Sequence, residues 1–333
     1  MAEIKNWRNS ERVWLKDIIP VDTPFTVNIE ASSLCNARCV YCVRSTKRDI
    51  SDDKNMPMEL FEKVVRDMKG FPKKVKLIDM YNSGEPLCNP KLADMISTIK
   101  AADVTETIGF TTNALLFNKE NIDRIIDSGI DVIRISLQGM TSETYKMICG
   151  VSMDFDKFIQ TLRYLYKRKG ECKIRMKIAD IALKDEAERI KFEETFGEIA
   201  DSIAIETIVP MYQDVDYDSV DNRISKRIAR GRNGQIHEVQ KVCYRPFIKI
   251  GVRANGKITA SCCDFENDII YGDAYRDNIV ELWHSVKRKE FLKMQLKGER
   301  YKHPSCKNCM IPQDVTNEKD ILDPYANEIL KRL

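Results

Sequence analysis

The sequence predicts an α/β protein whose main unit is an open barrel of parallel strands, followed by a small unit built on a hairpin and a helix. Six strand-like runs alternate with amphipathic helix-like stretches over the first two thirds of the chain. This alternation implies parallel strands joined by right-handed crossovers. No Gly-x-Gly-x-x-Gly follows the first run, so six units favour a partial barrel over a flat dinucleotide-binding sheet.

The strand-like runs share apolar, β-branched composition and are bounded by turn residues. They are Phe25–Ser32, Val75–Asn82, Thr107–Asn113, Val132–Gln138, Lys173–Ile181 and Ser202–Val209. Helix-like stretches with one apolar face separate them. Examples are Pro57–Lys69, Pro90–Ala101, Lys119–Ser128 and Phe155–Lys169.

Polar side chains recur at every second position of these runs and therefore share one face. The clearest are Asn28, Glu30, Asp79, Tyr81, Arg134, Ser136, Arg175, Lys177 and Glu206. A packed small barrel would place apolar residues inside, so we expect an open, polar lumen. Arg134, Arg175, Lys177 and Glu206 are predicted to contact the substrate, and an internal salt-bridge network is the alternative.

Charge and composition exclude several classes of partner. The 333 residues carry 54 Lys and Arg against 51 Asp and Glu, which gives no argument for a nucleic-acid partner. The first residues are charged, and no apolar run reaches membrane-spanning length. We expect a cytoplasmic protein without a membrane partner, in which the 11 cysteines are metal ligands or reduced thiols.

Three cysteines with the spacing C-x3-C-x2-C follow the first strand-like run directly. These residues, Cys35, Cys39 and Cys42, are too few to complete a tetrahedral zinc site alone. They suffice to hold three irons of a 4Fe–4S cube and leave the fourth iron open. Tyr41 is placed to cover one side of the cube. A zinc site or free buried thiols are the alternatives.

This motif, its aromatic position and its place after the first strand resemble the signature of the radical SAM family. The resemblance implies a (β/α)6 partial TIM barrel and an open iron that binds S-adenosylmethionine (SAM) through its amino and carboxylate groups. It also implies that the reduced cluster cleaves SAM to a 5′-deoxyadenosyl radical. An electron donor such as flavodoxin or ferredoxin is then an expected partner.

Loops at the carboxyl ends of three further strands are similar to the family's SAM contacts. A glycine-rich turn after the second strand resembles the segment that binds the SAM amino group. A Thr-Thr-Asn run after the third strand resembles the ribose contact, and two polar residues end the fourth strand. With Tyr41, the predicted contacts are Gly84, Glu85, Pro86, Thr112, Asn113, Ser136 and Gln138. For Ser136 and Gln138, capping of the strand end is the alternative.

The last third predicts a second metal site. The Asn255-Gly256 pair lies between the strand-like runs Phe247–Arg253 and Lys257–Ser261, which is a strong hairpin signal. A helix-like stretch, Asn278–Lys297, follows. The cysteines around these elements are Cys243, Cys262, Cys263, Cys306 and Cys309.

Four of these five cysteines suit one metal site. Because neighbouring strand residues point to opposite faces, only one of Cys262 and Cys263 joins it easily. Similarity to the twitch and SPASM extensions of radical SAM enzymes favours Cys262 as a ligand of an auxiliary 4Fe–4S cluster. No cysteine follows Cys309, which favours the one-cluster twitch form, and a zinc ribbon is the alternative.

These features divide the chain into an extension (1–21), the barrel (22–210), a linker or surface loop (211–241), the auxiliary-cluster unit (242–312) and a tail (313–333). The linker carries four arginines, at 223, 227, 230 and 232, which we expect to be mainly solvated. The resemblance extends over residues 22–312.

Within the family, the chain is similar to enzymes of the 2-deoxy-scyllo-inosamine dehydrogenase type and to other carbohydrate-modifying members. We expect it to oxidise a hydroxyl carbon of a sugar, aminocyclitol or similar polyhydroxylated small molecule, with the auxiliary cluster accepting an electron. One alternative is an epimerase in which Cys149 or Cys263 donates hydrogen. The other is a peptide-modifying maturase, which the short stretch before the first strand disfavours.

Overall fold

The computed structural model describes residues 3–4, 12–43, 54–211, 215–227, 230–232, 234, 236, 238–260, 269–315 and 317–333. Its strands are β1 (Glu3–Ile4), β2 (Thr26–Ile29), β3 (Leu77–Asp79), β4 (Ile108–Thr112), β5 (Val132–Leu137), β6 (Lys173–Ala179), β7 (Ser202–Glu206), β8 (Lys249–Val252), β9 (Lys257–Thr259) and β10 (Ile270–Asp273). They form one sheet in the order β1-β7-β6-β5-β4-β3-β2-β8-β9-β10.

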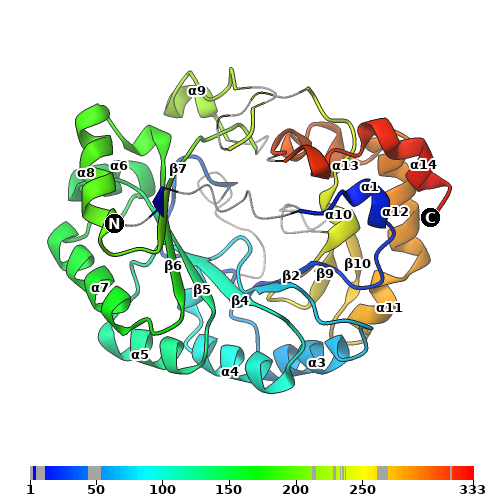
Figure 1. Ribbon diagram of the computed structural model, residues 1–333, viewed down its shortest axis with the longest axis horizontal. Helices are drawn as coiled ribbons and strands as arrows, with labels where there is room; N and C mark the ends of the chain where they lie inside the picture. The colour runs from blue at the N-terminus through cyan, green and yellow to red at the C-terminus, as the bar shows by residue number, and fades with distance from the viewer. Residues whose placement is uncertain are drawn as a thin grey trace.

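Helices such as α3, α4, α5, α7 and α8 cover the outer, convex side of this curved sheet (Figure 1). The described helices are α1 (Leu15–Ile18), α3 (Met58–Met68), α4 (Leu92–Ala102), α5 (Lys119–Asp127), α6 (Ser142–Cys149), α7 (Phe155–Arg168), α8 (Glu186–Gly197), α9 (Tyr217–Val220), α10 (Arg245–Ile248), α11 (Ile279–Trp283), α12 (Val286–Leu296), α13 (Pro304–Lys307) and α14 (Ala326–Leu330). No helix in the described ranges is long and apolar enough to cross a bilayer.

The predicted partial barrel is confirmed. The six strand-like runs become β2 to β7, and these strands pair in parallel with their neighbours. The sheet does not close on itself, because β1 and β10 are its two edges. Figure 1 shows the strands curving around a central space with the helices outside.

The alternation of side chains along β5 shows why the barrel has a polar lumen. Ile133, Ile135 and Leu137 are at most 1% exposed and pack in the main core under the helices. Arg134 and Ser136, on the opposite face, are half-buried. The helices complete the core with their apolar faces: α3, for example, buries Leu60, Phe61, Val64, Val65 and Met68.

The C-terminal hairpin continues the barrel sheet. β8 pairs in parallel with β2, from Thr26 opposite Lys249 to Ile29 opposite Val252, and then turns back antiparallel into β9. The turn contains Gly256 at φ +88°, the left-handed conformation that the Asn-Gly signal predicts. The predicted helix over 278–297 is divided into α11 and α12. The small unit therefore lies directly beside the strand that precedes the cysteine motif.

Candidate functional site

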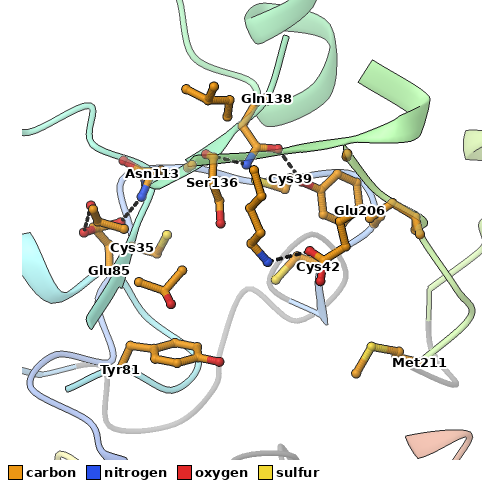
Figure 2. A pocket seen from close by; sticks show the side chains of 18 of the residues that line it. Cys35, Cys39, Cys42, Tyr81, Glu85, Asn113, Ser136, Gln138, Glu206 and Met211 are labelled. Carbon is orange, nitrogen blue, oxygen red and sulfur yellow. Dashed lines mark hydrogen bonds and ion pairs between the residues drawn. The ribbon is translucent and has the colours of Figure 1, made fainter. Parts of the chain in front are cut away.

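A cavity of about 230 Å³ lies at the carboxyl ends of the barrel strands. It brings together the cysteine motif, the loops after β3 and β4, the ends of β5 to β7 and part of the linker (Figure 2). Among the predicted residues, it is lined by Cys35, Cys39, Tyr41, Cys42, Gly84, Glu85, Thr112, Asn113, Ser136, Gln138, Lys177 and Glu206. Pro86 does not line it and is buried in the short turn that follows Glu85.

The C-terminal end of α6 supports the cysteine loop from behind. The backbone N–H of Arg38 donates to the carbonyl of Cys149 at 2.9 Å, and that of Val40 donates to the carbonyl of Ile148 at 2.9 Å. Burial and the neighbouring thiols of Cys42, Cys149 and Cys35 raise the pKa of Cys39 well above its ordinary value. Thiolates packed this way need a cationic partner to persist.

The three thiols of the motif fit an iron–sulfur cube better than a single ion. Within the described ranges, no three Cys, His, Asp or Glu side chains converge on one metal-ion position. A cube does not require such convergence, because each thiolate binds a different iron. Three thiols that line one cavity are the donor set of a cube with an open iron.

Close packing fixes the glycine-rich loop against the cysteine loop. A Cβ atom on Gly84 would lie 2.2 Å from the carbonyl oxygen of Ser32 and 2.6 Å from that of Leu34. Backbone atoms cannot yield at those distances, so this position requires glycine. The next residue, Glu85, donates its N–H to the carbonyl of Leu34 at 2.7 Å. The two predicted cofactor loops therefore share one rigid backbone contact.

The carboxyl group of Glu85 ties this loop to the end of β4. It is 3% exposed and accepts hydrogen bonds from Thr112 Oγ1 at 2.6 Å, from the N–H of Asn113 at 2.8 Å and from the N–H of Leu87 at 3.1 Å. Burial raises its pKa to about 7, and the three hydrogen bonds oppose this rise. Glu85 thus orders the predicted SAM loops and titrates near neutral pH.

Tyr41 joins the cysteine loop to the end of β5. Its hydroxyl donates to Gln138 Oε1, and Gln138 Nε2 donates to the carbonyl of Ser136 at 3.0 Å. Burial, followed by the nearby thiols, raises the pKa of Tyr41 well above its ordinary value. The neutral phenol therefore stays a hydrogen-bond donor and closes this side of the cavity.

A chain of ion pairs runs from the cavity toward the C-terminal unit. Lys177 pairs with Glu206, whose other oxygen lies 3.3 Å from Arg232 NH1. Arg232 Nε lies 3.2 Å from Asp314 Oδ2, and the same oxygen lies 2.6 Å from Arg245 NH2. These side chains are at most 21% exposed. Opposite charges held together away from water fix the linker against the barrel.

The expectation that the linker arginines are mainly solvated is wrong for two of them. Arg232 lines the cavity, and Arg227 pairs with Asp180 at 2.9 Å and donates to the carbonyl of Ile208. Sequence reasoning also missed Met211 and Tyr217, which line the cavity. The place of Met211 just after the sixth strand-like run was an available signal, because the carboxyl ends of parallel strands meet at one edge.

Three of the predicted auxiliary ligands come together beneath the linker. Cys243 and Cys309 pack against Val209, Met211 and Ile311, and Cys306 is buried nearby. Burial and the adjacent thiols raise the pKa of Cys243 to about 11 and that of Cys306 to about 12.

Hydrogen bonds hold this second cysteine group in place. Arg300 donates to the backbone carbonyls of Cys306 and Cys309, and Gln295 Nε2 lies 3.7 Å from Cys306 Sγ. A group of thiols with donors around it is the environment of a ligated cluster. Cys262 and Cys263 lie outside the described residues.

Other predicted residues lie away from this cavity. Arg134 pairs with Asp79, and both Arg134 and Arg175 line a different cavity, at the amino ends of the strands. Cys149 is fully buried in α6, and its thiol donates to the carbonyl of Tyr145 at 3.0 Å. It does not line the first cavity.

Two domain families match the chain. Residues 29–180 match the radical SAM superfamily, and residues 243–310 match the SPASM family, an iron–sulfur cluster-binding domain. Together these families imply SAM and 4Fe–4S clusters as cofactors. The matched ranges contain the first and the second cysteine group respectively.

Curated relatives support the same assignment. A GTP 3′,8-cyclase of Clostridium perfringens is 28% identical over 162 residues, and the chain spans about half of that relative's length, 48%. The tungsten-containing aldehyde ferredoxin oxidoreductase cofactor-modifying protein of Pyrococcus furiosus is 22% identical over 337 residues, covering 90% of this chain and 91% of the relative.

Solved structures show the same fold at low identity. BtrN in complex with AdoMet and 2-DOIA superposes with a TM-score of 0.53 at 17% identity, covering 85% of this chain and 92% of BtrN. Streptococcus suis SuiB bound to the precursor peptide SuiA superposes with a TM-score of 0.60 at 16% identity. The superposition covers 90% of this chain and 72% of SuiB.

Proposed function

We propose, from the premise that this chain is a radical SAM enzyme with a C-terminal SPASM domain, that it oxidises a hydroxyl carbon of a polyhydroxylated small molecule such as a sugar or aminocyclitol. The reaction removes the hydrogen on that carbon, one further electron and the hydroxyl proton, and leaves a carbonyl group. The substrate would occupy the part of the first cavity that SAM does not fill.

The two cysteine groups are the sites at which the cofactors would be held. Cys35, Cys39 and Cys42 would bind the first 4Fe–4S cluster, and Cys243, Cys306 and Cys309 would bind the second together with Cys262. When bound, the first cluster and SAM supply a 5′-deoxyadenosyl radical that removes hydrogen from carbon, and the second cluster supplies a one-electron acceptor. The protein supplies position, orientation and the exclusion of water.

The observation that carries the proposal is the wall shared by the two sites. Val209 and Met211 line the first cavity and also belong to the apolar group against which Cys243 and Cys309 pack. Figure 2 labels Met211 at the edge of the same space as Cys42 and Glu206. A substrate in the cavity would thus be separated from the second cysteine group by one layer of side chains. Such proximity is what an oxidation with a built-in electron acceptor needs.

The charged wall suits a substrate rich in hydroxyl groups. Lys177, Glu206 and Arg232 present ammonium, carboxylate and guanidinium groups to the cavity, and Tyr81 also lines it. Sugar hydroxyls both donate and accept hydrogen bonds, so each of these groups has a partner on such a molecule. Because the ion pairs fix the side chains, they would determine which carbon faces the SAM loops.

The position of Cys149 supports oxidation over epimerisation. A thiol that returns hydrogen to a substrate radical must reach the cavity, whereas the Cys149 thiol is buried behind the cysteine loop and donates to Tyr145. Cys263 lies outside the described residues, and its donor role stays an alternative. A peptide substrate, as in SuiB bound to SuiA, is a further alternative, and product mass distinguishes it from a small-molecule substrate.

Product mass tests the proposal. Anaerobically reconstituted enzyme would be incubated with reductant, SAM and panels of sugars, aminocyclitols and short peptides. We expect a hydroxylated small molecule to lose two hydrogens in step with 5′-deoxyadenosine formation, and the Cys35→Ala/Cys39→Ala/Cys42→Ala variant to form neither product. Unchanged mass with one deuterium gained in heavy water would mean epimerisation, and modification of peptides alone would mean a maturase.

A further inference from the structure

A second cavity, of about 730 Å³, opens at the amino-terminal ends of β4, β5 and β6, the opposite end of the barrel from the cysteine motif. Arg134 and Arg175 line it, whereas Ser136 and Lys177, two residues further along the same strands, line the first cavity. The two cavities are therefore stacked along the lumen, about 7 Å apart at 3.3 Å of rise per residue.

The lining of this second cavity is strongly basic. It contains five basic side chains, Lys76, Arg134, Lys169, Lys173 and Arg175, and two acidic ones, Asp131 and Glu171. Polar and apolar residues of the strand starts complete it. This excess of positive charge contrasts with the near balance of the whole chain, 54 basic against 51 acidic residues.

Three acidic groups around the cavity are already paired, two of them with Arg134 and Lys169 of its own lining. Asp79 pairs with Arg134, and Asp201 pairs with Lys169 at 3.0 Å while accepting the N–H of Ile174 at 2.7 Å. Asp131 pairs with Lys100 at 2.6 Å and accepts the N–H of Ile108. The carboxylates of Asp79, Asp131 and Asp201 are therefore engaged in contacts that hold the barrel strands together.

Arg175 takes part in none of these pairs. In the described part of the chain it forms no salt bridge, although it is half-buried and faces Arg134, its registered neighbour on β5. Burial, followed by repulsion from Arg134, lowers the pKa of Arg175, and attraction by Asp201 opposes part of this fall. Holding a half-buried guanidinium beside a second one costs free energy unless an anion compensates it.

The rim of the cavity leaves room for a ligand. Lys173 is exposed beside Arg175, and the Lys76 ammonium lies 4.3 Å from the centre of the Phe25 ring without a carboxylate partner among the described residues. Gly170 sits on the rim at φ +54°, and a Cβ there would meet no atom within 4 Å. Flexible lysines around a half-buried guanidinium can close on an anion that enters from solvent.

We infer that this amino-terminal mouth is a second ligand site, which takes an oxyanion, specifically the phosphate group of a small molecule. Arg175 would donate its guanidinium N–H groups to two oxygens, and Lys173 and Lys76 would add charge from the rim. Phosphate suits this set because it offers several oxygens to donors that approach from different strands. The site goes beyond the proposed oxidation and does not depend on it.

The test is calorimetric titration of the cluster-loaded full chain with pyrophosphate, at low ionic strength and with saturating SAM. We expect one site, with Arg175→Gln weakening the affinity at least about tenfold, since a charged hydrogen bond is lost. Lys173→Gln should weaken it severalfold, and Glu171→Gln should strengthen it, because a negative charge leaves the rim. Inorganic phosphate, a hexose phosphate and acetate are titrated in the same way.

Matched controls distinguish binding at this site from a non-specific effect of charge and from binding in the first cavity. Arg124→Gln and Glu143→Gln change the same charges on exposed helical positions and should leave pyrophosphate affinity unchanged. Binding that is insensitive to Arg175→Gln and Lys173→Gln but lost in Arg232→Gln would place the anion in the first cavity and overturn the inference. Equal affinity for acetate would overturn the phosphate assignment.

Thermal unfolding guards against a folding defect. Without ligand, Arg175→Gln should melt at or above the temperature of the parent, because an uncompensated half-buried charge is removed. With pyrophosphate the parent should gain stability and the variant should not. A variant that is much less stable without any anion would show that Arg175 is a structural residue and would also contradict the inference.

Discussion

Arg253 NH1 lies 3.5 Å from Glu30 Oε1, and this ion pair joins the strand before the cysteine motif to the turn after β8, with both side chains 4% exposed. The same carboxylate accepts the N–H and the hydroxyl of Ser83 and the N–H of Ala254. Glu30 thus links the glycine-rich loop, the barrel and the small unit through one buried charge.

Glu30→Gln should destabilise the protein by roughly 3–5 kcal/mol, because it removes the carboxylate charge that faces the buried Arg253 guanidinium. Urea unfolding measures this change, and SAM affinity should fall with it because Ser83 loses a charged acceptor. The matched control is Glu62→Gln in an exposed pair with Arg66, which should cost at most about 1 kcal/mol. Equal losses in both variants would contradict the structural role of Glu30.

Glu85 should make stability fall as the pH rises toward neutrality. Its pKa in the folded protein is about 7, above the unfolded value of 4.5, so folding favours the protonated form. The contribution is fully present below about pH 4.5 and is lost as the pH rises through about 7, by about 3 kcal/mol in total. Denaturant unfolding at pH values between 4.5 and about 7 should show the free energy of unfolding falling with pH in the parent but not in Glu85→Gln. The control Glu59→Gln, at an exposed position, should behave as the parent does.

Loss of the second cysteine group should uncouple the two halves of the reaction. Cys306→Ala/Cys309→Ala removes two of the ligands that we propose for the auxiliary cluster but leaves the cysteine motif intact. We expect about half the iron, continued formation of 5′-deoxyadenosine and little oxidised product. Iron analysis and product chromatography measure the three quantities. Full oxidation by a variant that lacks the second cluster would exclude the electron-acceptor role.

Arg232→Gln should raise the KM for the substrate about tenfold and increase SAM cleavage without product, because the cavity wall loses its link between Glu206 and Asp314. Steady-state kinetics and the ratio of 5′-deoxyadenosine to product report both effects. The control is Arg223→Gln in the same linker, where the arginine is 69% exposed and pairs with Asp221. Identical kinetics in the two variants would show that Arg232 does not contribute to substrate binding.

Cys149→Ala should still oxidise the substrate, since the proposed reaction needs no thiol hydrogen. Removal of one buried sulfur should cost about 1 kcal/mol of stability through lost packing. Cys172→Ala, a buried thiol at the amino-terminal end of the barrel, is the control for that packing loss. A folded, cluster-loaded Cys149→Ala enzyme that cleaves SAM yet releases no product would favour the epimerase alternative.

Local patterns were sufficient to predict the fold and both cysteine groups. The C-x3-C-x2-C spacing, the Asn255-Gly256 turn and the alternation along β5 each act over a few residues. Their physical causes are equally local: ligand geometry, a left-handed turn and the opposite orientation of neighbouring strand side chains. The sequence by itself therefore determined the α/β barrel, the hairpin beside it and the place of the first cysteine group after the first barrel strand.

The tertiary structure alone decided how far along the lumen each polar residue lies and what it contacts. Alternation places Arg175 and Lys177 on one face but does not say that they line different cavities. That depends on strand register and on the loops that close each end of the barrel. Likewise Arg232 meets Glu206 and Asp314 only because the chain folds back so that positions 82 apart, Arg232 and Asp314, come together, and no short-range pattern encodes such a contact.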